Sequence, residues 1–195
     1  MYGIVIHYAD DIMIATDDSL EHHIQQVGEV LRRLSEGNIK IRPHKVNIAR
    51  DTIEFLGVTW KKGQINIPEA RVLAFREIPI PDTPKKLKSV LCALSYYRRF
   101  VPRFATLTQE LMDLTTLHPK QFKLTDTQKE QFTTLIDTMC KNTVLYLPDP
   151  DKPYYVQTDA SQFCGAGKVF QKGDDGSEQL LACISRTFTK AEQRY

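Results

Sequence analysis

Apolar residues at the start of the chain fall into two short runs that flank a pair of acids. The runs are Ile4-Val5-Ile6 and Ile12-Met13-Ile14, with Tyr8-Ala9-Asp10-Asp11 between them. Two β-prone runs joined by a short polar stretch predict a hairpin with strands over 2–8 and 12–16. If side chains alternate up to the tip, Tyr8 and Asp10 share one face, and Ala9 and Asp11 share the other.

The next pattern is helical. Apolar residues recur at spacings of four, three, four and three residues, at Leu20, Ile24, Val27, Leu31 and Leu34. This spacing predicts one amphipathic helix, with Asp18 or Ser19 as its N-cap and Gly37 at its end. We expect the apolar stripe to pack in a core, so that hairpin and helix form part of an α+β layer.

The middle of the chain combines strands with helices. Residues 52–60 and 64–67 are predicted strands, joined by a turn at 61–63, and Pro68 suits the first turn of a short helix. The extended, proline-rich stretch 78–82 is the first expected subdomain boundary. Thr83-Pro84 then predicts a capped helix whose apolar face is Leu87, Val90, Leu91 and Leu94. A further short helix follows Pro102.

The last third of the chain begins with a capping-box pattern, Thr125 to Gln128, which predicts a helix ending near Asn142. The turn-rich stretch 148–153 is the second expected boundary. Three strands are predicted over 154–158, 165–171 and 179–185, and a capped helix begins at 189–192.

Charge and cysteine content restrict the function classes. The net charge is only +2, but the segment from Pro84 to Phe104 contains no acidic residue and six basic ones: Lys85, Lys86, Lys88, Arg98, Arg99 and Arg103. Such a segment favours a polyanionic partner, although a solvated helix face is the alternative. The four cysteines are scattered without a C-x-x-C pair, which indicates free thiols rather than zinc, redox or disulfide chemistry.

The pair Asp10-Asp11 is unusual for a turn. A structural hairpin turn normally uses Asn-Gly or Asp-Gly, because glycine tolerates positive φ. Asp-Asp offers no such relief and places two like charges side by side. A divalent cation would offset that repulsion, and Mg²⁺ typically takes one or two carboxylates together with substrate phosphates. A solvated acidic turn is the alternative.

Five blocks occur in the same order as in one known family. They are Tyr8-Ala9-Asp10-Asp11, the segment 37–45, Glu54-Phe55-Leu56-Gly57-Val58, the segment 94–104, and Thr158-Asp159-Ala160-Ser161 followed by Gly165-Ala166-Gly167. Together they resemble the reverse transcriptase and RNase H region of the Pol polyprotein of gypsy-type LTR retrotransposons. The resemblance implies an α+β fold: a truncated right-hand polymerase palm and thumb, then a connecting segment and the first strands of an RNase H-like α/β domain.

The resemblance also implies a division of the chain. Residues 1–80 would be the C-terminal part of the palm, 81–118 the thumb helices, 119–150 a connecting helix, and 151–195 the N-terminal part of the RNase H-like domain.

The activity implied is RNA-directed DNA polymerisation, in which dNTPs are added to a primer by two-metal catalysis, with associated ribonuclease H. The metal would be Mg²⁺, with Mn²⁺ as a substitute. Asp10 and Asp11 would bind it, Asp10 more strongly, and Asp159 would be the first metal-binding carboxylate of the RNase H site. Lys45 would protonate the leaving pyrophosphate, unless it is an ordinary surface lysine.

Nucleic-acid contacts are implied as well. Tyr8 and Ala9 would contact the primer end, and Phe55, Leu56 and Gly57 would form the primer grip. The thumb cations Lys85, Lys88, Arg98, Arg99 and Arg103 would bind phosphates, with either Tyr97 or Phe100 belonging to the core. Expected partners are a primer–template duplex, RNA–DNA or DNA, dNTPs, and the rest of the Pol polyprotein in cis. The chain has no signal-peptide pattern and no run of about 20 apolar residues, so we expect it in the cytoplasm, the nucleus or a virus-like particle.

Both sites look incomplete. The family's earlier catalytic strand cannot fit before Tyr8, and Asp17 and Asp18 look like helix-capping or solvated acids. The remaining RNase H acids would lie beyond Tyr195, and Lys168 replaces a small or apolar family residue, so it could compete with metal at Asp159. We therefore expect the isolated chain not to extend a primer. The alternative is a non-enzymatic nucleic-acid-binding module, domesticated or relic.

Overall fold

The computed structural model describes residues 4–16 and 19–194. The chain divides into two compact units, Met1–Lys62 and Gly63–Tyr195. This division falls before the proline-rich stretch 78–82 that the sequence marks as a boundary. Asp17, Asp18 and the predicted strand residues before Ile4 lie outside the described residues.

The first unit opens with the predicted hairpin, β1 (Ile4–Tyr8) and β2 (Asp11–Ala15). The strands are antiparallel and Tyr8 lies opposite Asp11. The alternation predicted for the tip is therefore wrong. Ala9 and Asp10 form the turn instead of continuing a strand, and Tyr8 and Asp11 share a face because directly opposed residues do so.

Helix α1 (Leu20–Glu36) begins as predicted, since the Ser19 side chain accepts a hydrogen bond from the His22 amide at 3.2 Å. It ends at Gly37, but the left-handed residue is Asn38, with φ +55°. The amide of Ile39 donates to the Leu34 carbonyl at 2.9 Å, and the amide of Asn38 donates to that of Ser35 at 3.0 Å. This pattern is a Schellman motif, which satisfies carbonyls that the helix end leaves unpaired.

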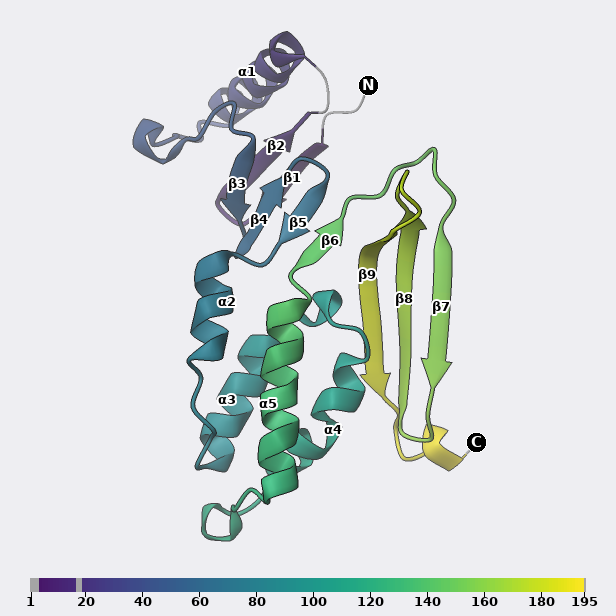
Figure 1. Cartoon of the computed structure of the whole chain (residues 1–195). Helices are drawn as coiled ribbons and strands as arrows, with labels where there is room; N and C mark the ends of the chain where they lie inside the picture. Colours follow the sequence, from purple (N-terminus) through teal and green to yellow (C-terminus); the bar gives the residue numbers. More distant parts are fainter. Residues whose placement is uncertain (1–3, 17–18, 195) are drawn as a thin grey trace. The chain divides into compact units, whose positions relative to one another are not determined.

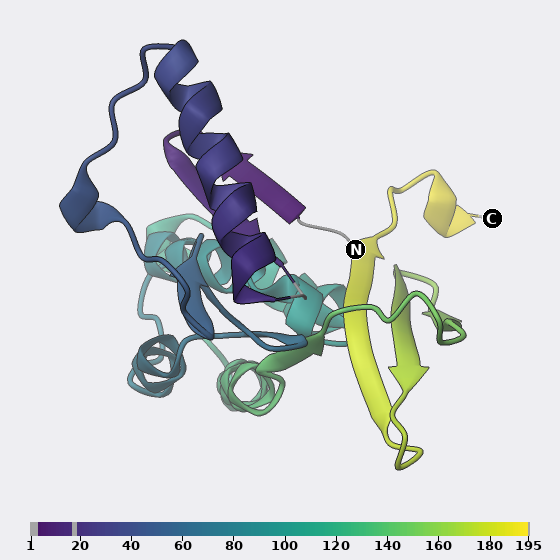
Figure 2. The ribbon, with the colours of Figure 1, turned by 90° about the horizontal axis from the view of Figure 1, so that it is seen from above.

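The expected burial of the α1 stripe is wrong for the described residues. No residue of this helix is buried, and Leu20 and Ile24 remain 61% and 56% exposed. The helix lies beside the hairpin in both views (Figures 1 and 2) and contacts β2. A two-stranded hairpin is too narrow to cover an entire helix face.

The predicted strand over 52–60 is in fact a hairpin. Strands β3 (Thr52–Phe55) and β4 (Val58–Lys61) are antiparallel, with Phe55 opposite Val58. The two turn residues, Leu56 and Gly57, have φ of +49° and +67°. Positive φ at both central residues is the type I′ signature, which matches the twist of the flanking strands.

The second unit starts with β5 (Gln64–Asn66), which pairs antiparallel with the distant β6 (Val144–Tyr146). Pro68 is the N-cap of α2 (Glu69–Arg76), one position earlier than a first-turn proline.

Three longer helices follow: α3 (Pro84–Ser95), α4 (Phe104–Leu114) and α5 (Asp126–Lys141). The short helices η2 (Arg98–Phe100) and η3 (Pro119–Gln121) lie between them. The Thr83 cap and the Thr125–Gln128 capping box both form as predicted. The apolar faces of the three longer helices and of η2 meet in one core. Its most deeply buried side chains include Leu87, Leu91, Leu94, Phe100, Leu111, Phe132, Leu135 and Met139.

A three-stranded antiparallel sheet completes this unit. It consists of β7 (Tyr155–Ala160), β8 (Cys164–Lys172) and β9 (Glu178–Thr187), in that order, followed by the short helix η4 (Glu192–Arg194). Helix α4 lies between α5 and this sheet (Figure 1) and contacts β8 and β9. The amide of Ala105 donates to the Ser185 hydroxyl at 2.9 Å, so the start of α4 is fixed to β9.

Gln171 ties the second predicted boundary to the sheet. Its side chain is 1% exposed and donates to the carbonyls of Asp149 (2.7 Å) and Lys152 (2.9 Å). It also accepts from the Asp149 amide at 2.9 Å. The loop 148–153 is therefore held in place by hydrogen bonds to the buried Gln171 side chain.

All four cysteines carry free thiols, as the sequence predicts. Among the described helices, none combines the length and the apolar character that crossing a membrane would require.

Candidate active site and nucleic-acid interface

The tip of the first hairpin presents its acids to solvent. Asp10 and Asp11 are both exposed, and Tyr8 is 65% exposed. Ala9 has φ +49°, a conformation that non-glycine residues rarely adopt. Met13, only 3% exposed, anchors β2. The tight turn thus holds two carboxylates at an accessible edge.

These carboxylates fit part of a metal-binding set. Oxygen ligands are what Mg²⁺ prefers, and it commonly takes one or two protein carboxylates while substrate phosphates complete its shell. Within residues 4–16 and 19–194, no group of three or more His, Cys, Asp or Glu side chains is assembled that could hold a metal ion by itself.

The other predicted polymerase residues lie in the same unit. Phe55 and Val58 are buried, and Leu56-Gly57 form the turn between them. Lys45 is exposed on the short helix η1 (Pro43–Lys45). The structure therefore places the predicted primer grip at a tight turn rather than along a strand.

The predicted phosphate-binding cations of the thumb do not all have the same surroundings. Lys85 and Lys88 are exposed on α3, away from its buried leucines. The Arg98 guanidinium donates to the Ser185 carbonyl of β9, and Arg99 lies over the Phe100 ring at 5.5 Å. We expected one of Tyr97 and Phe100 to be core, and both are buried.

Asp159 is about half exposed, at 54% of its side chain. It lies near the end of β7, opposite Ala166 of β8. Its Oδ2 forms an ion pair with Nη2 of Arg103 at 2.9 Å. The turn after β7 is built by Ser161, whose hydroxyl accepts from the amides of Phe163 and Cys164.

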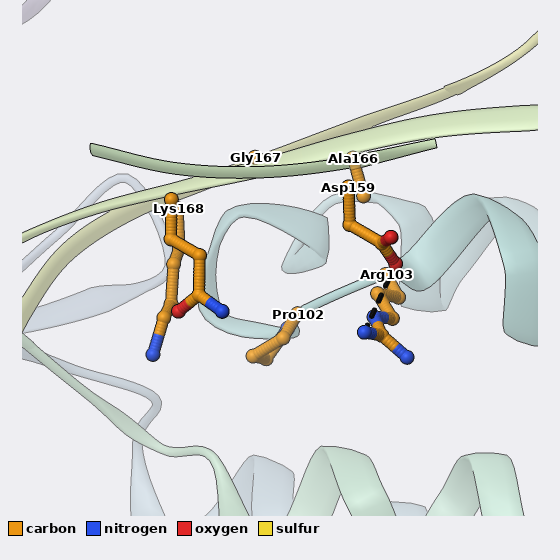
Figure 3. Close-up of a pocket in the computed structure, with 7 residues that line it drawn as sticks. Pro102, Arg103, Asp159, Ala166, Gly167 and Lys168 are labelled. Atoms are coloured by element: carbon orange, nitrogen blue, oxygen red, sulfur yellow. Dashed lines mark ion pairs between the residues drawn. The ribbon is translucent and has the colours of Figure 1, made fainter. Parts of the chain in front are cut away.

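This ion pair borders a cavity of about 200 Å³ (Figure 3). The lining residues are Pro102, Arg103, Gln157, Asp159, Ala166, Gly167 and Lys168. Asp159 and Lys168 extend from the sheet toward the side on which Pro102 and Arg103 lie. The Lys168 ammonium pairs with both carboxylate oxygens of Glu178, at 2.6 and 2.8 Å, and lies over the Phe170 ring at 4.9 Å.

Several residues at this site were not found by sequence reasoning. Gln157 lines the cavity, and Glu178 forms an ion pair with Lys168. The Ser185 hydroxyl accepts a hydrogen bond from an amide of α4. Strand alternation carries a usable signal for Gln157, because it places that residue on the same face as Asp159. No local pattern indicates the partners of Glu178 or Ser185, which depend on strand register and helix packing.

The fold matches part of a solved reverse transcriptase. A solved structure of the foamy viral protease-reverse transcriptase in complex with an RNA/DNA hybrid superposes with a TM-score of 0.79. The alignment covers 97% of this chain and 26% of that chain, at 22% sequence identity.

Sequence comparisons identify the family more closely. Residues 3–60 match the family of reverse transcriptases (RNA-dependent DNA polymerases), and residues 124–195 match the RNase H-like domain found in reverse transcriptase. The Pol polyproteins of the Drosophila melanogaster transposons opus and gypsy are each 30% identical over 96% of this chain. The chain therefore belongs to the reverse transcriptase and RNase H region of LTR retrotransposon Pol polyproteins. It spans 20% and 19% of those two relatives.

Proposed function

We propose that this chain contributes the acidic hairpin of an RNA-directed DNA polymerase, which adds dNTPs to a primer, together with the start of its RNase H domain. The observation that carries the proposal is the exposed Asp10-Asp11 pair at a tight turn, within the segment that matches reverse transcriptases. A turn with a purely structural role has no need of two adjacent like charges.

The proposed roles follow from placement. Asp10 and Asp11 would hold Mg²⁺, or Mn²⁺ in its place, which when bound would activate the primer hydroxyl and hold the triphosphate. Tyr8 flanks the turn and Ala9 forms part of it, and both would contact the primer end there. The Leu56-Gly57 turn would bring backbone close to the primer, which glycine permits. Lys45 would supply a proton to pyrophosphate.

The proposed partners are a primer–template duplex, dNTPs and the rest of the Pol polyprotein in cis. Exposed Lys85 and Lys88 would make phosphate contacts, which give sequence-independent and salt-sensitive affinity. The proposed location is the cytoplasm, the nucleus or a virus-like particle.

Primer extension tests this proposal. In a longer Pol chain that contains residues 1–195, Asp10→Asn should lower Mg²⁺-dependent dNTP incorporation by more than about 100-fold, because loss of a partner outside the first coordination shell already costs about 10- to 100-fold. Asp11→Asn should have a smaller effect in the same direction.

Asp126→Asn is the matched control, since Asp126 is a 98% exposed carboxylate on α5 and its loss should leave incorporation unchanged. If both hairpin variants copy template as fast as the unaltered chain, the proposal is wrong.

A further inference from the structure

The start of α4 is capped by a residue from a distant strand. The first amides of a helix have no acceptor within the helix, and the side chain of the N-cap residue commonly accepts from one of them. The N-cap residue here is Arg103, which makes no such bond because a guanidinium group carries only donors. The amide of Ala105 donates instead to the hydroxyl of Ser185, eighty positions along the chain, at 2.9 Å.

This hydrogen bond is buried and has a second contact beside it. Ser185 is 3% exposed and Ala105 is 7% exposed. The Arg98 guanidinium of η2 donates to the Ser185 carbonyl, so the side chain and the backbone of Ser185 both bind the chain that leads into α4. A buried amide that loses its acceptor pays its full desolvation cost, since water cannot replace the lost bond. Ser185 is therefore well placed to hold the start of α4 against β9.

Ser185 also belongs to a row of opposed residues that crosses the sheet. It lies opposite Ala166 of β8, and Ala166 lies opposite Asp159 of β7. Directly opposed residues share a face, and neighbouring strands lie about 4.8 Å apart, so the backbones of Ser185 and Asp159 are separated by about 10 Å. Pro102 and Arg103 lie on the same side as the Asp159 side chain, over Ala166 (Figure 3). The chain that leads into α4 therefore contacts all of this row.

The two ends of the row differ in strength. At the β7 end Arg103 pairs with Asp159, but the two side chains are 62% and 54% exposed. An ion pair between exposed side chains contributes little to stability. At the β9 end the Ser185 hydrogen bond is buried. The anchor is therefore Ser185, and the Asp159 carboxylate can change partner without releasing α4.

We propose that Ser185 is a positioning residue, which fixes α4 to the sheet so that Asp159 keeps a constant position relative to this helix. The geometry of residues 63–195 carries the cap and the row. The consequence for catalysis rests on the proposed function, in which α4 belongs to the thumb that holds the duplex and Asp159 to the RNase H site. A constant separation of the two would confine RNA cleavage to a narrow set of positions.

Hydrogen exchange tests the cap in the 195-residue chain without metal or nucleic acid. In the unaltered chain the Ala105 amide should be protected although it lies in the first turn of a helix, and rapid exchange there would overturn the proposal. In Ser185→Ala this amide should exchange about five- to thirtyfold faster, the factor to which loss of a helix cap corresponds. Ser185→Thr keeps a hydroxyl and should restore the protection.

Ser161→Ala is the matched control. The Ser161 hydroxyl also accepts from backbone amides, those of Phe163 and Cys164, but it does so in the turn after β7. Its loss should leave exchange at Ala105 unchanged, and an equal acceleration there would overturn the proposal. The proposal also fails if Ser185→Ala accelerates the amides of β8 and α5 as much as that of Ala105, because the variant would then only have lowered the stability of the whole unit.

Mapping of cleavage positions tests the consequence. A longer Pol chain that contains residues 1–195 is given an end-labelled RNA strand annealed to a DNA primer, and the cuts are measured from the primer end. Ser185→Ala should broaden the distribution of cuts, and Ser185→Thr should restore it. Less cleavage at unchanged positions would indicate lost stability alone and would overturn the proposal. If the unaltered Pol chain cuts no RNA, the proposed function is contradicted, while hydrogen exchange still decides the role of Ser185.

Discussion

Ala9, Leu56 and Arg103 all hold left-handed backbone conformations although none of them is glycine. Each lies where the resemblance predicts a nucleic-acid contact: the acidic hairpin, the primer-grip turn and the thumb. The cost of such a conformation is roughly 1–2 kcal/mol per residue, and strain of this kind tends to gather at functional sites. Sequence patterns did not reveal it, because composition marks positive φ only where glycine or asparagine is used.

Cysteine reactivity should follow burial. Desolvation raises the pKa of the Cys183 thiol to about 11, so the reactive thiolate is scarce at pH 8. Cys92 is exposed on α3. Brief iodoacetamide treatment followed by peptide mass spectrometry should show Cys92 labelled well before Cys183. Urea should remove the difference, and equal labelling in the folded chain would contradict the described packing of β9.

The hydrogen-bonded cap that Thr189 and Glu192 form near the end of the chain should respond to acid. The Arg186 guanidinium, with the amide and hydroxyl of Thr189, lowers the pKa of Glu192 to about 2, from an ordinary value of 4.5. A lowered pKa stabilises the folded cap above pH 4.5, and that contribution is lost as the pH falls toward 2. The NMR shift of the Thr189 amide, which donates to Glu192 at 2.8 Å, should move in that window. In Glu192→Gln the amide should show no such titration.

At the scale of elements, helix starts are the features that the sequence predicts best. Ser19, Thr83 and Thr125 all cap helices as expected, because a cap is a local hydrogen bond between a side chain and an amide three residues away. The turn at Leu56-Gly57 was missed, since an apolar leucine in a left-handed turn hides the break between two strands. The burial of the α1 stripe was also mispredicted, because periodicity shows which face is apolar but not what covers it.

Two glycines should respond in opposite ways to alanine. Gly28 lies inside α1, and a Cβ there would meet nothing within 4 Å, so Gly28→Ala should stabilise the helix by about 0.5–1 kcal/mol. Gly57 has a φ of +67°, so Gly57→Ala should lower the free energy of unfolding by about 1–2 kcal/mol.

Urea titrations can separate these two effects. Far-UV circular dichroism reports the helix, and the chain's single tryptophan, Trp60, reports the β3–β4 hairpin by fluorescence. A stabilising Gly57→Ala would contradict the type I′ turn.

At the scale of the molecule, the resemblance found the family, and the comparisons confirm it. The compact units were not predicted, because the sequence marks boundaries by proline and turn residues, whereas compactness depends on long-range contacts. Residues 63–195 hold together through contacts such as Ala105 with Ser185, eighty positions apart. The division of 81–195 into thumb, connecting helix and RNase H-like start remains a prediction.

Gln171 shows what that cohesion means for the stretch 148–153. Its proline and aspartate content is what one expects of a protease-sensitive linker, yet its backbone is hydrogen-bonded to a buried amide. Severing the chain there would leave that amide inside the sheet without its acceptors, at a cost of about 1–3 kcal/mol for each unsatisfied group. The place that looks most suitable for dividing this protein into pieces is therefore one where division would damage both of them.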